Sequence, residues 1–136
     1  MEPRGIRNNN PLNIRKGCEW KGERHPQTDP SFEEFQTMEY GIRAGFKLLK
    51  NYITGYGGRG KPVRTINAII RRWAPPSENA TQRYIDFVAK DSKINAFEPL
   101  DFKDRPKMVA IVDAMIFVEC GQRISRDVIQ SAYDLV

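Results

Sequence analysis

The residue whose type and position point most directly to chemistry is Glu119, in the sequence Val118-Glu119-Cys120-Gly121. It closes an apolar segment that starts near Pro106 and is predicted to be helical, with the glycine ending the helix. A carboxylate at the negative end of a helix macrodipole is disfavoured in its ionised form. A glutamate that stays partly protonated can act as the general acid that glycoside cleavage requires. The alternative is a solvated glutamate beside a glycine cap.

An N-terminal run, RGIRNNNPLNIR, holds four asparagines around Pro11. Asparagine donates and accepts hydrogen bonds and tolerates left-handed backbone, so the run suits turns as well as recognition of hydroxyl or acetamide groups. We predict that Asn10 and Asn13 bind substrate, and Trp20 is a further candidate to line the same cleft. The alternative is a turn held together by its own side chains.

A second cluster, WAPPSENATQRY, spans residues 73–84. Its two prolines separate two predicted helices, and its aromatic rings and amides are of the kinds that cover sugar faces and bond sugar hydroxyls. We predict a substrate-binding role for Trp73, Asn79 and Tyr84. The alternative is an ordinary helix–helix corner with Trp73 in the core.

The composition fits one globular domain that covers residues 1–136 and can bury a core without a disulfide or metal. No apolar run is long enough to span a membrane, and the N-terminus lacks a signal-peptide pattern. We therefore expect synthesis in the cytoplasm, with any exit by another route.

The net charge of +5 is unevenly distributed. Residues 1–76 hold 14 Lys/Arg and 7 Asp/Glu, a balance of +7, whereas residues 77–136 hold 8 and 10, a balance of −2. A basic half suggests an anionic partner, such as nucleic acid, a membrane surface or a cell-wall polymer. Nucleic acid is the weakest of these, because no helix–turn–helix, RRM or zinc signature is present and the basic residues are scattered.

The two cysteines and the single histidine restrict the possible chemistry. Cys18 and Cys120 lack metal-ligand spacing, so we predict neither a metal site nor an organic cofactor. A Cys/His amidase with His25 as its base is an alternative. It is disfavoured because Cys120 lies at a helix C-terminus, which raises the pKa of a thiol.

The spacing of apolar residues and the positions of proline, glycine and capping residues predict a mainly α chain. Residues 1–31 are rich in proline and glycine and are expected to form an irregular lobe, with a small hairpin between the stretch around Trp20 and residues 31–37. Apolar spacing and capping residues predict helices over 39–53, 65–74, 78–89, 104–119 and 125–135. Thr65 and Ser125 are the expected N-caps, Asn79 and Gln82 an expected capping pair, and Pro75 and Pro76 end the second helix.

These motifs together resemble a family of short phage and prophage proteins described as virion structural proteins. The family's marks are an RGIRNNNPxNIR start, a W-x-G, a GIRA segment, a WAPPxEN corner and an E-x-G near the C-terminus. They stand here at residues 4–15, 20–22, 41–44, 73–79 and 119–121. Many members have Asn in the middle of the last motif, where this chain has Cys120.

A more distant similarity implies a fold and an activity. Bacterial wall glucosaminidases carry an asparagine motif followed by W-x-G and an aromatic stretch, similar to residues 10–15, 20–22 and 32–40. In those enzymes and in lysozyme-like transglycosylases, a helix ending in E-S-G precedes the asparagine motif. Here only nine residues precede Asn10, and the comparable E-x-G lies at the other end of the chain. The resemblance implies a circularly permuted lysozyme-like domain, in which Glu119 faces the N-terminal motif.

The resemblance implies cleavage of peptidoglycan glycan strands, by a muramidase or a lytic transglycosylase, with Glu119 as general acid/base. One acid suffices for a transglycosylase, because the substrate's own C6 hydroxyl attacks the anomeric carbon. Glu19, Glu23, Glu39 and Glu78 are competing acids. A non-catalytic phage structural or wall-binding module of the same fold is the alternative, and in either case the protein is expected to be virion-associated or released to act on the cell wall.

Overall fold

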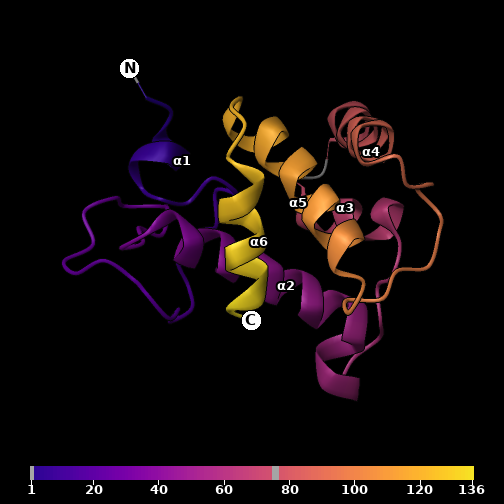
Figure 1. Cartoon of the computed structure of the whole chain (residues 1–136), viewed down its shortest axis with the longest axis horizontal. Helices are drawn as coiled ribbons and strands as arrows, with labels where there is room; N and C mark the ends of the chain where they lie inside the picture. Colours follow the sequence, from indigo (N-terminus) through magenta and orange to yellow (C-terminus); the bar gives the residue numbers. More distant parts are fainter. Residues whose placement is uncertain (1, 75–76) are drawn as a thin grey trace. The chain divides into compact units, whose positions relative to one another are not determined.

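A computed structural model of the chain describes residues 2–74 and 77–136, apart from the side chain of Glu78. The described residues confirm a mainly α chain. Their β-structure consists of two isolated antiparallel bridges, Arg15–Phe32 and Glu23–Phe35, which link the two predicted hairpin stretches without forming strands. The helices are α1 (Arg4–Arg7), α2 (Met38–Gly58), α3 (Ile66–Trp73), α4 (Glu78–Ser92), α5 (Arg105–Cys120) and α6 (Arg126–Asp134) (Figure 1).

Several helix ends follow the expected local signals. The Thr65 hydroxyl accepts a hydrogen bond from the Ala68 amide at 3.1 Å, and Ser125 caps α6 in the same manner through Asp127. Gly121 ends α5 with a φ of 73°, and its amide donates to the Phe117 carbonyl. A left-handed residue after the last helical turn is a common helix stop, and glycine adopts it without steric cost.

The start of α4 differs from expectation. Ser77 occupies the N-cap position, so Asn79 already lies in the first turn and the predicted Asn79–Gln82 capping pair is wrong. Gln82 instead accepts from Arg71 and donates to Asp86. The predicted helix-ending prolines, Pro75 and Pro76, lie outside the described residues.

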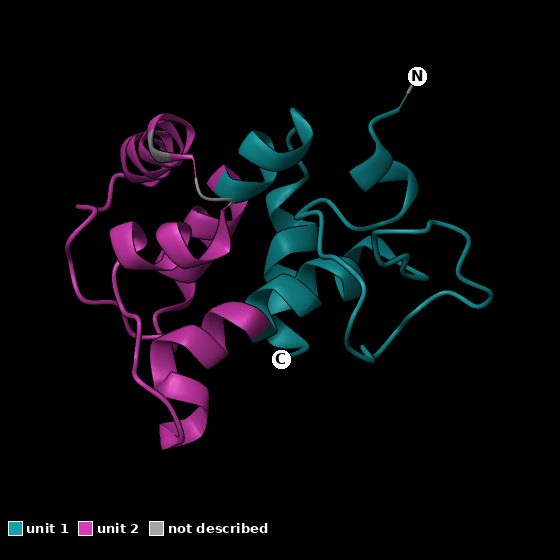
Figure 2. Ribbon diagram, turned by 180° about the vertical axis from the view of Figure 1, so that it is seen from behind, with its two compact units in different colours: residues 1–47, 115–136 teal, residues 48–114 magenta. Residues whose placement is uncertain are grey.

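The residues from 1 to 47 and from 115 to 136 form one compact unit, unit 1 (Figure 2). Within it, α6 packs on the first half of α2, where the rings of Phe46 and Tyr133 meet edge to face at 5.4 Å. The start of α2 also packs tightly on the N-terminal run: a Cβ added to Gly41 would lie 1.7 Å from the Asn9 carbonyl oxygen. Glycine is required there for close approach of two backbones.

Residues 48–114 form the second compact unit, unit 2 (Figure 2). Its helices α3 and α4 pack against each other, and α3 buries Ile66, Ile69 and Ile70. The second half of α2 ends in an unusual left-handed turn, because Gly55, Tyr56 and Gly57 all have positive φ. The prediction of a single domain over residues 1–136 stays a prediction.

Among the residues that the structure describes, no helix is both long enough and apolar enough to cross a membrane.

Candidate functional site

The centre of the candidate site is a contact between Asn13 and Glu119, two predicted site residues that lie 106 positions apart in the sequence. The Asn13 side-chain amide donates to the Glu119 carboxylate at 3.1 Å and to the Glu119 backbone carbonyl at 3.1 Å. Both residues belong to unit 1 and are partly exposed. The end of α5 therefore lies against the asparagine run at the other end of the chain.

The backbone of the run explains how Asn13 reaches this position. Asn9 and Asn13 have φ values of 53° and 54°, which confirms the expected left-handed turns. The Asn10 amide donates to the Gly5 carbonyl at 2.7 Å and folds the run back on α1. A Cβ on Gly5 would lie 2.9 Å from the Asn10 carbonyl oxygen and 3.2 Å from Asn13 Oδ1, so Gly5 permits this close approach.

Asn10 is an internal support of the turn. Its side chain is 1% exposed, donates to the Ile14 and Glu33 carbonyls at 2.9 and 3.0 Å, and accepts from the Ile14 amide at 3.0 Å. Both amide hydrogens are thereby used within the protein. These contacts favour the turn-forming alternative over the predicted sugar contact for Asn10.

Trp20 lies next to a pair of glutamates. Its backbone amide donates to Glu23 Oε1 at 2.8 Å, and its buried indole nitrogen has no hydrogen-bond partner among the described residues. Glu23 in turn shares a side-chain hydrogen bond with Glu33, which is 3% exposed. A proton held between two carboxyl groups satisfies such a contact. The Oε2 atom of Glu33 is buried and has no hydrogen-bond partner in the part of the chain that the structure describes.

The contact shifts the pKa values of Glu23 and Glu33 in opposite directions. Burial, together with the hydrogen bond and charge of Glu23, raises the pKa of Glu33 to about 7. The hydrogen bond with Glu33 lowers the pKa of Glu23, and the hydrogen bond from the Trp20 backbone amide lowers it further. At neutral pH, Glu23 is therefore the ionised member and Glu33 holds the shared proton for much of the time.

Sequence reasoning named Glu23 as a competing acid but missed Glu33. A signal was present in Phe32-Glu33-Glu34-Phe35, where two carboxylates stand between aromatic residues. Both glutamates are buried, yet only Glu34 has enough donors, from Thr28 and Asp29, for its pKa to be lowered despite its burial. Which glutamate obtains the donors depends on the tertiary fold.

The remaining predicted site residues belong to unit 2. Trp73 ends α3 and is half-buried, Asn79 is exposed in the first turn of α4, and Tyr84 is 8% exposed in the middle of α4. The burial of Tyr84 fits the helix–helix corner alternative for that ring. Their predicted place in a cleft with Glu119 stays a prediction.

Of the two cysteines, Cys120 has an environment that disfavours a nucleophile. Both are free thiols, with Cys18 exposed and Cys120 half-buried. Burial raises the pKa of the Cys120 thiol, and the charge of Glu119 adds to the rise. Within residues 2–74 and 77–136, no group of three or more His, Cys, Asp or Glu side chains is arranged to hold a metal ion.

The fold and this contact together define a mainly helical protein in which a glutamate at a helix end is held by an N-terminal asparagine turn. No protein-family model matches the chain. Protein P5 of Pseudoalteromonas phage PM2 is 44% identical to it over 122 residues, which cover 87% of this chain and 71% of the phage protein. The chain belongs to the family of this phage protein.

Proposed function

We propose that this protein cleaves the glycan strands of peptidoglycan, with Glu119 as the general acid/base, and that it has a circularly permuted lysozyme-like fold. The observation that carries the proposal is the pair of hydrogen bonds from Asn13 to Glu119. A glycosidase acid must be held in one orientation beside the bond that breaks. Asn13 supplies this support, because it binds the side chain and the backbone of Glu119 together.

The chemistry needs one proton carrier. The Glu119 carboxyl would give its proton to the glycosidic oxygen as the bond to the anomeric carbon breaks. The resulting carboxylate would then take a proton from the incoming nucleophile, which is the substrate's C6 hydroxyl in a lytic transglycosylase and water in a muramidase. Trp20, Trp73, Asn79 and Tyr84 remain the proposed residues of the glycan cleft.

Glu33 is the strongest competitor for the role of acid, because its pKa lies near neutrality. Its side chain, however, is only 3% exposed, so a glycosidic oxygen has no access to it in this conformation. Glu119 is partly exposed at the end of α5. Accessibility therefore favours Glu119 for the proton transfer and a structural role for Glu33.

Membership in a phage protein family supports a second candidate, a non-catalytic virion or wall-binding module of the same fold. In this case the Asn13–Glu119 contact would only tie the end of α5 to the N-terminal run. Other virion proteins would then be its partners, with or without the glycan.

The test is cleavage of purified peptidoglycan sacculi by the wild-type protein and by Glu119→Gln. Glutamine keeps the size of the side chain and its acceptor for Asn13 but cannot deliver a proton. General acid catalysis is typically worth about 10²–10⁴-fold, so turbidity clearing should fall by at least about 10²-fold. Glu2→Gln, which changes an exposed glutamate of the same unit, should clear sacculi like the wild type.

Mass spectrometry of the products identifies the reaction. Anhydro-muramyl ends indicate a lytic transglycosylase, and reducing ends indicate a hydrolase. Intact sacculi after treatment with folded wild-type protein would support the non-catalytic module. Equal clearing by the wild type and Glu119→Gln would remove Glu119 from the mechanism, and Glu33, Glu39 and Glu78 would then be the next acids to test.

A further inference from the structure

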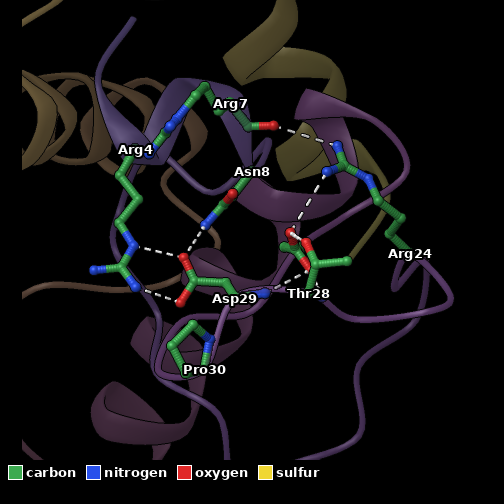
Figure 3. A pocket seen from close by; sticks show the side chains of 8 residues that line it. Arg4, Arg7, Asn8, Arg24, Thr28, Asp29 and Pro30 are labelled. Carbon is green, nitrogen blue, oxygen red and sulfur yellow. Dashed lines mark hydrogen bonds and ion pairs between the residues drawn. The ribbon is translucent and has the colours of Figure 1, made fainter.

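A pocket of about 510 Å³ lies in unit 1, formed entirely by residues from the first quarter of the chain. Arginines and carboxylates dominate its lining, and Figure 3 shows Arg4 and Arg24 on opposite sides of Asp29 and Thr28. It was not predicted from the sequence. The lining residues are Arg4, Arg7, Asn8, Arg24, Thr28, Asp29, Pro30 and Glu34.

The first carboxylate, Asp29, is fully used by the protein. Arg4 binds it with two parallel hydrogen bonds of 2.5 Å, and the Asn8 amide donates to it at 3.0 Å. The backbone amides of Ser31 and Phe32 donate to its Oδ1 at 2.9 and 3.0 Å. The Arg4 guanidinium, foremost among these donors, holds the pKa of Asp29 well below its usual range. Asp29 is thus a permanently charged anchor for Arg4.

The second carboxylate, Glu34, is used in the same way. It accepts from the Thr28 amide and hydroxyl at 2.5 and 2.6 Å and from the Asp29 amide at 3.2 Å. It is 3% exposed. Neither carboxylate therefore offers a free acceptor to a ligand that enters the pocket.

The pocket has more guanidinium donors than its two carboxylates use. The Arg7 side chain is exposed and forms no hydrogen bond or ion pair with any residue that the structure describes. Among the residues that the structure describes, the Arg24 side chain makes long polar contacts, 3.4 Å to the Arg7 carbonyl and 3.9 Å to Glu34. With three guanidinium groups and two carboxylates, the lining has a net charge of +1. The side chains of Arg7 and Arg24 therefore have guanidinium donors available for a ligand.

We propose that this pocket binds an oxyanion, a carboxylate or phosphate group, through Arg7 and Arg24, with Arg4 held in place by Asp29. The planar fork of an arginine matches the paired oxygens of such a group and binds them with charge-assisted hydrogen bonds. Two sources have this chemistry: the carboxylates of cell-wall peptides and free phosphate. The proposal is independent of the glycan-cleaving reaction, because no residue of the pocket takes part in the Asn13–Glu119 contact.

The test is calorimetric titration of the folded protein with two probes, inorganic phosphate and a muramyl peptide that has free carboxylates. Arg7→Gln is the main variant, because Arg7 supports no other side chain and its replacement should leave the melting temperature unchanged. A charged hydrogen bond is worth roughly 1.5–3 kcal/mol, so the variant should bind at least about tenfold more weakly. Arg24→Gln should weaken binding in the same direction.

Arg59→Gln is the matched control, because it removes the same charge from an exposed arginine that lies outside the pocket. Peptide binding alone identifies the wall carboxylate as the source, and phosphate binding alone identifies a phosphate. The proposal is overturned if neither probe binds at millimolar concentration, or if Arg7→Gln and Arg59→Gln weaken binding equally. Sacculus cleavage is measured separately, so its presence or absence does not affect this result.

Discussion

Glu33 has the most perturbed environment of the glutamates in the described part of the chain, and this environment affects stability. Its pKa rises from 4.5 to about 7 on folding, because the folded state buries it beside Glu23. The native state therefore binds a proton more tightly than the unfolded state between these two values. Stability contributed by the protonated form is complete below about pH 4.5 and is lost as the pH rises through about 7.

Glu33→Gln should remove this pH dependence. Between pH 5 and pH 8 the wild type should lose on the order of 2 kcal/mol of unfolding free energy relative to the variant. Glutamine also offers a neutral donor to Glu23, so the two proteins should be nearly equal at pH 5. Urea unfolding at both pH values measures the difference. A constant difference between wild type and variant across the range would contradict the raised pKa of Glu33.

Cys120 gives a second prediction at the scale of one residue. Because burial raises the pKa of its thiol, little thiolate is present at neutral pH. We expect Cys120→Asn to keep any sacculus-clearing activity within about twofold, since the proposed acid is the neighbouring Glu119. If a folded Cys120→Asn protein has lost all activity that the wild type possesses, a cysteine nucleophile with His25 as its base becomes the better hypothesis.

At the scale of elements, the contact between α2 and the N-terminal run positions the candidate site. Gly41 allows the Asn9 carbonyl to lie against α2, where a methyl group would approach the oxygen to 1.7 Å. Gly45, one turn further along α2, makes room for the Leu12 side chain in the same way. A Cβ added to Gly45 would lie 2.2 Å from Leu12 Cδ1. The asparagine turn is therefore seated on α2 by backbone contact as well as by apolar packing.

Gly41→Ala should consequently destabilise the protein severely. Overpacking of a tight contact typically costs about 1–3 kcal/mol and sometimes more, and here the obstructing atom belongs to the backbone. Gly60→Ala is the control, because its added Cβ would lie 3.4 Å from the Tyr56 ring, an ordinary contact. Thermal melts of both variants measure the effect. Equal melting temperatures for the two variants would show that the N-terminal run can move away from α2 at little cost.

At the scale of the whole molecule, the asymmetric charge and the phage family are the main properties. The chain belongs to the family of a phage protein, which supports virion or cell-wall partners as proposals. Some of the 14 basic residues among residues 1–76 are used in ion pairs within the protein, for example Arg4, which pairs with Asp29. Fewer basic groups are therefore available to an anionic polymer than the sequence suggests.

Nucleic-acid binding should accordingly be weak and nonspecific. We expect retention of duplex DNA at 20 mM salt to be lost at 200 mM, because few phosphate contacts form and counterion release supplies the attraction. A filter-binding series over this range measures the loss, with Arg59→Gln and Arg7→Gln compared at the lowest salt. Retention that persists at 200 mM would revive the nucleic-acid hypothesis for the basic half.

Local signals in the sequence determined much of the helical framework. Thr65, Ser125 and Gly121 mark helix ends because caps and glycine stops act within a few residues of the chain. The same locality predicted left-handed turns in the asparagine run. It failed for the capping pair at Asn79, because the helix begins earlier, with Ser77 at the N-cap position and without a side-chain capping hydrogen bond.

Only the tertiary structure decided which polar side chains meet. The Asn13–Glu119 contact joins residues 106 positions apart, and sequence led to it only through the order of motifs in a resembling family. The acidity of Glu33 and the pocket around Arg7 had no such guide. Both depend on how deeply a charged side chain is buried and on how many hydrogen-bond donors lie near the carboxylates. Packing between residues far apart in the sequence sets both properties, and no local pattern encodes them.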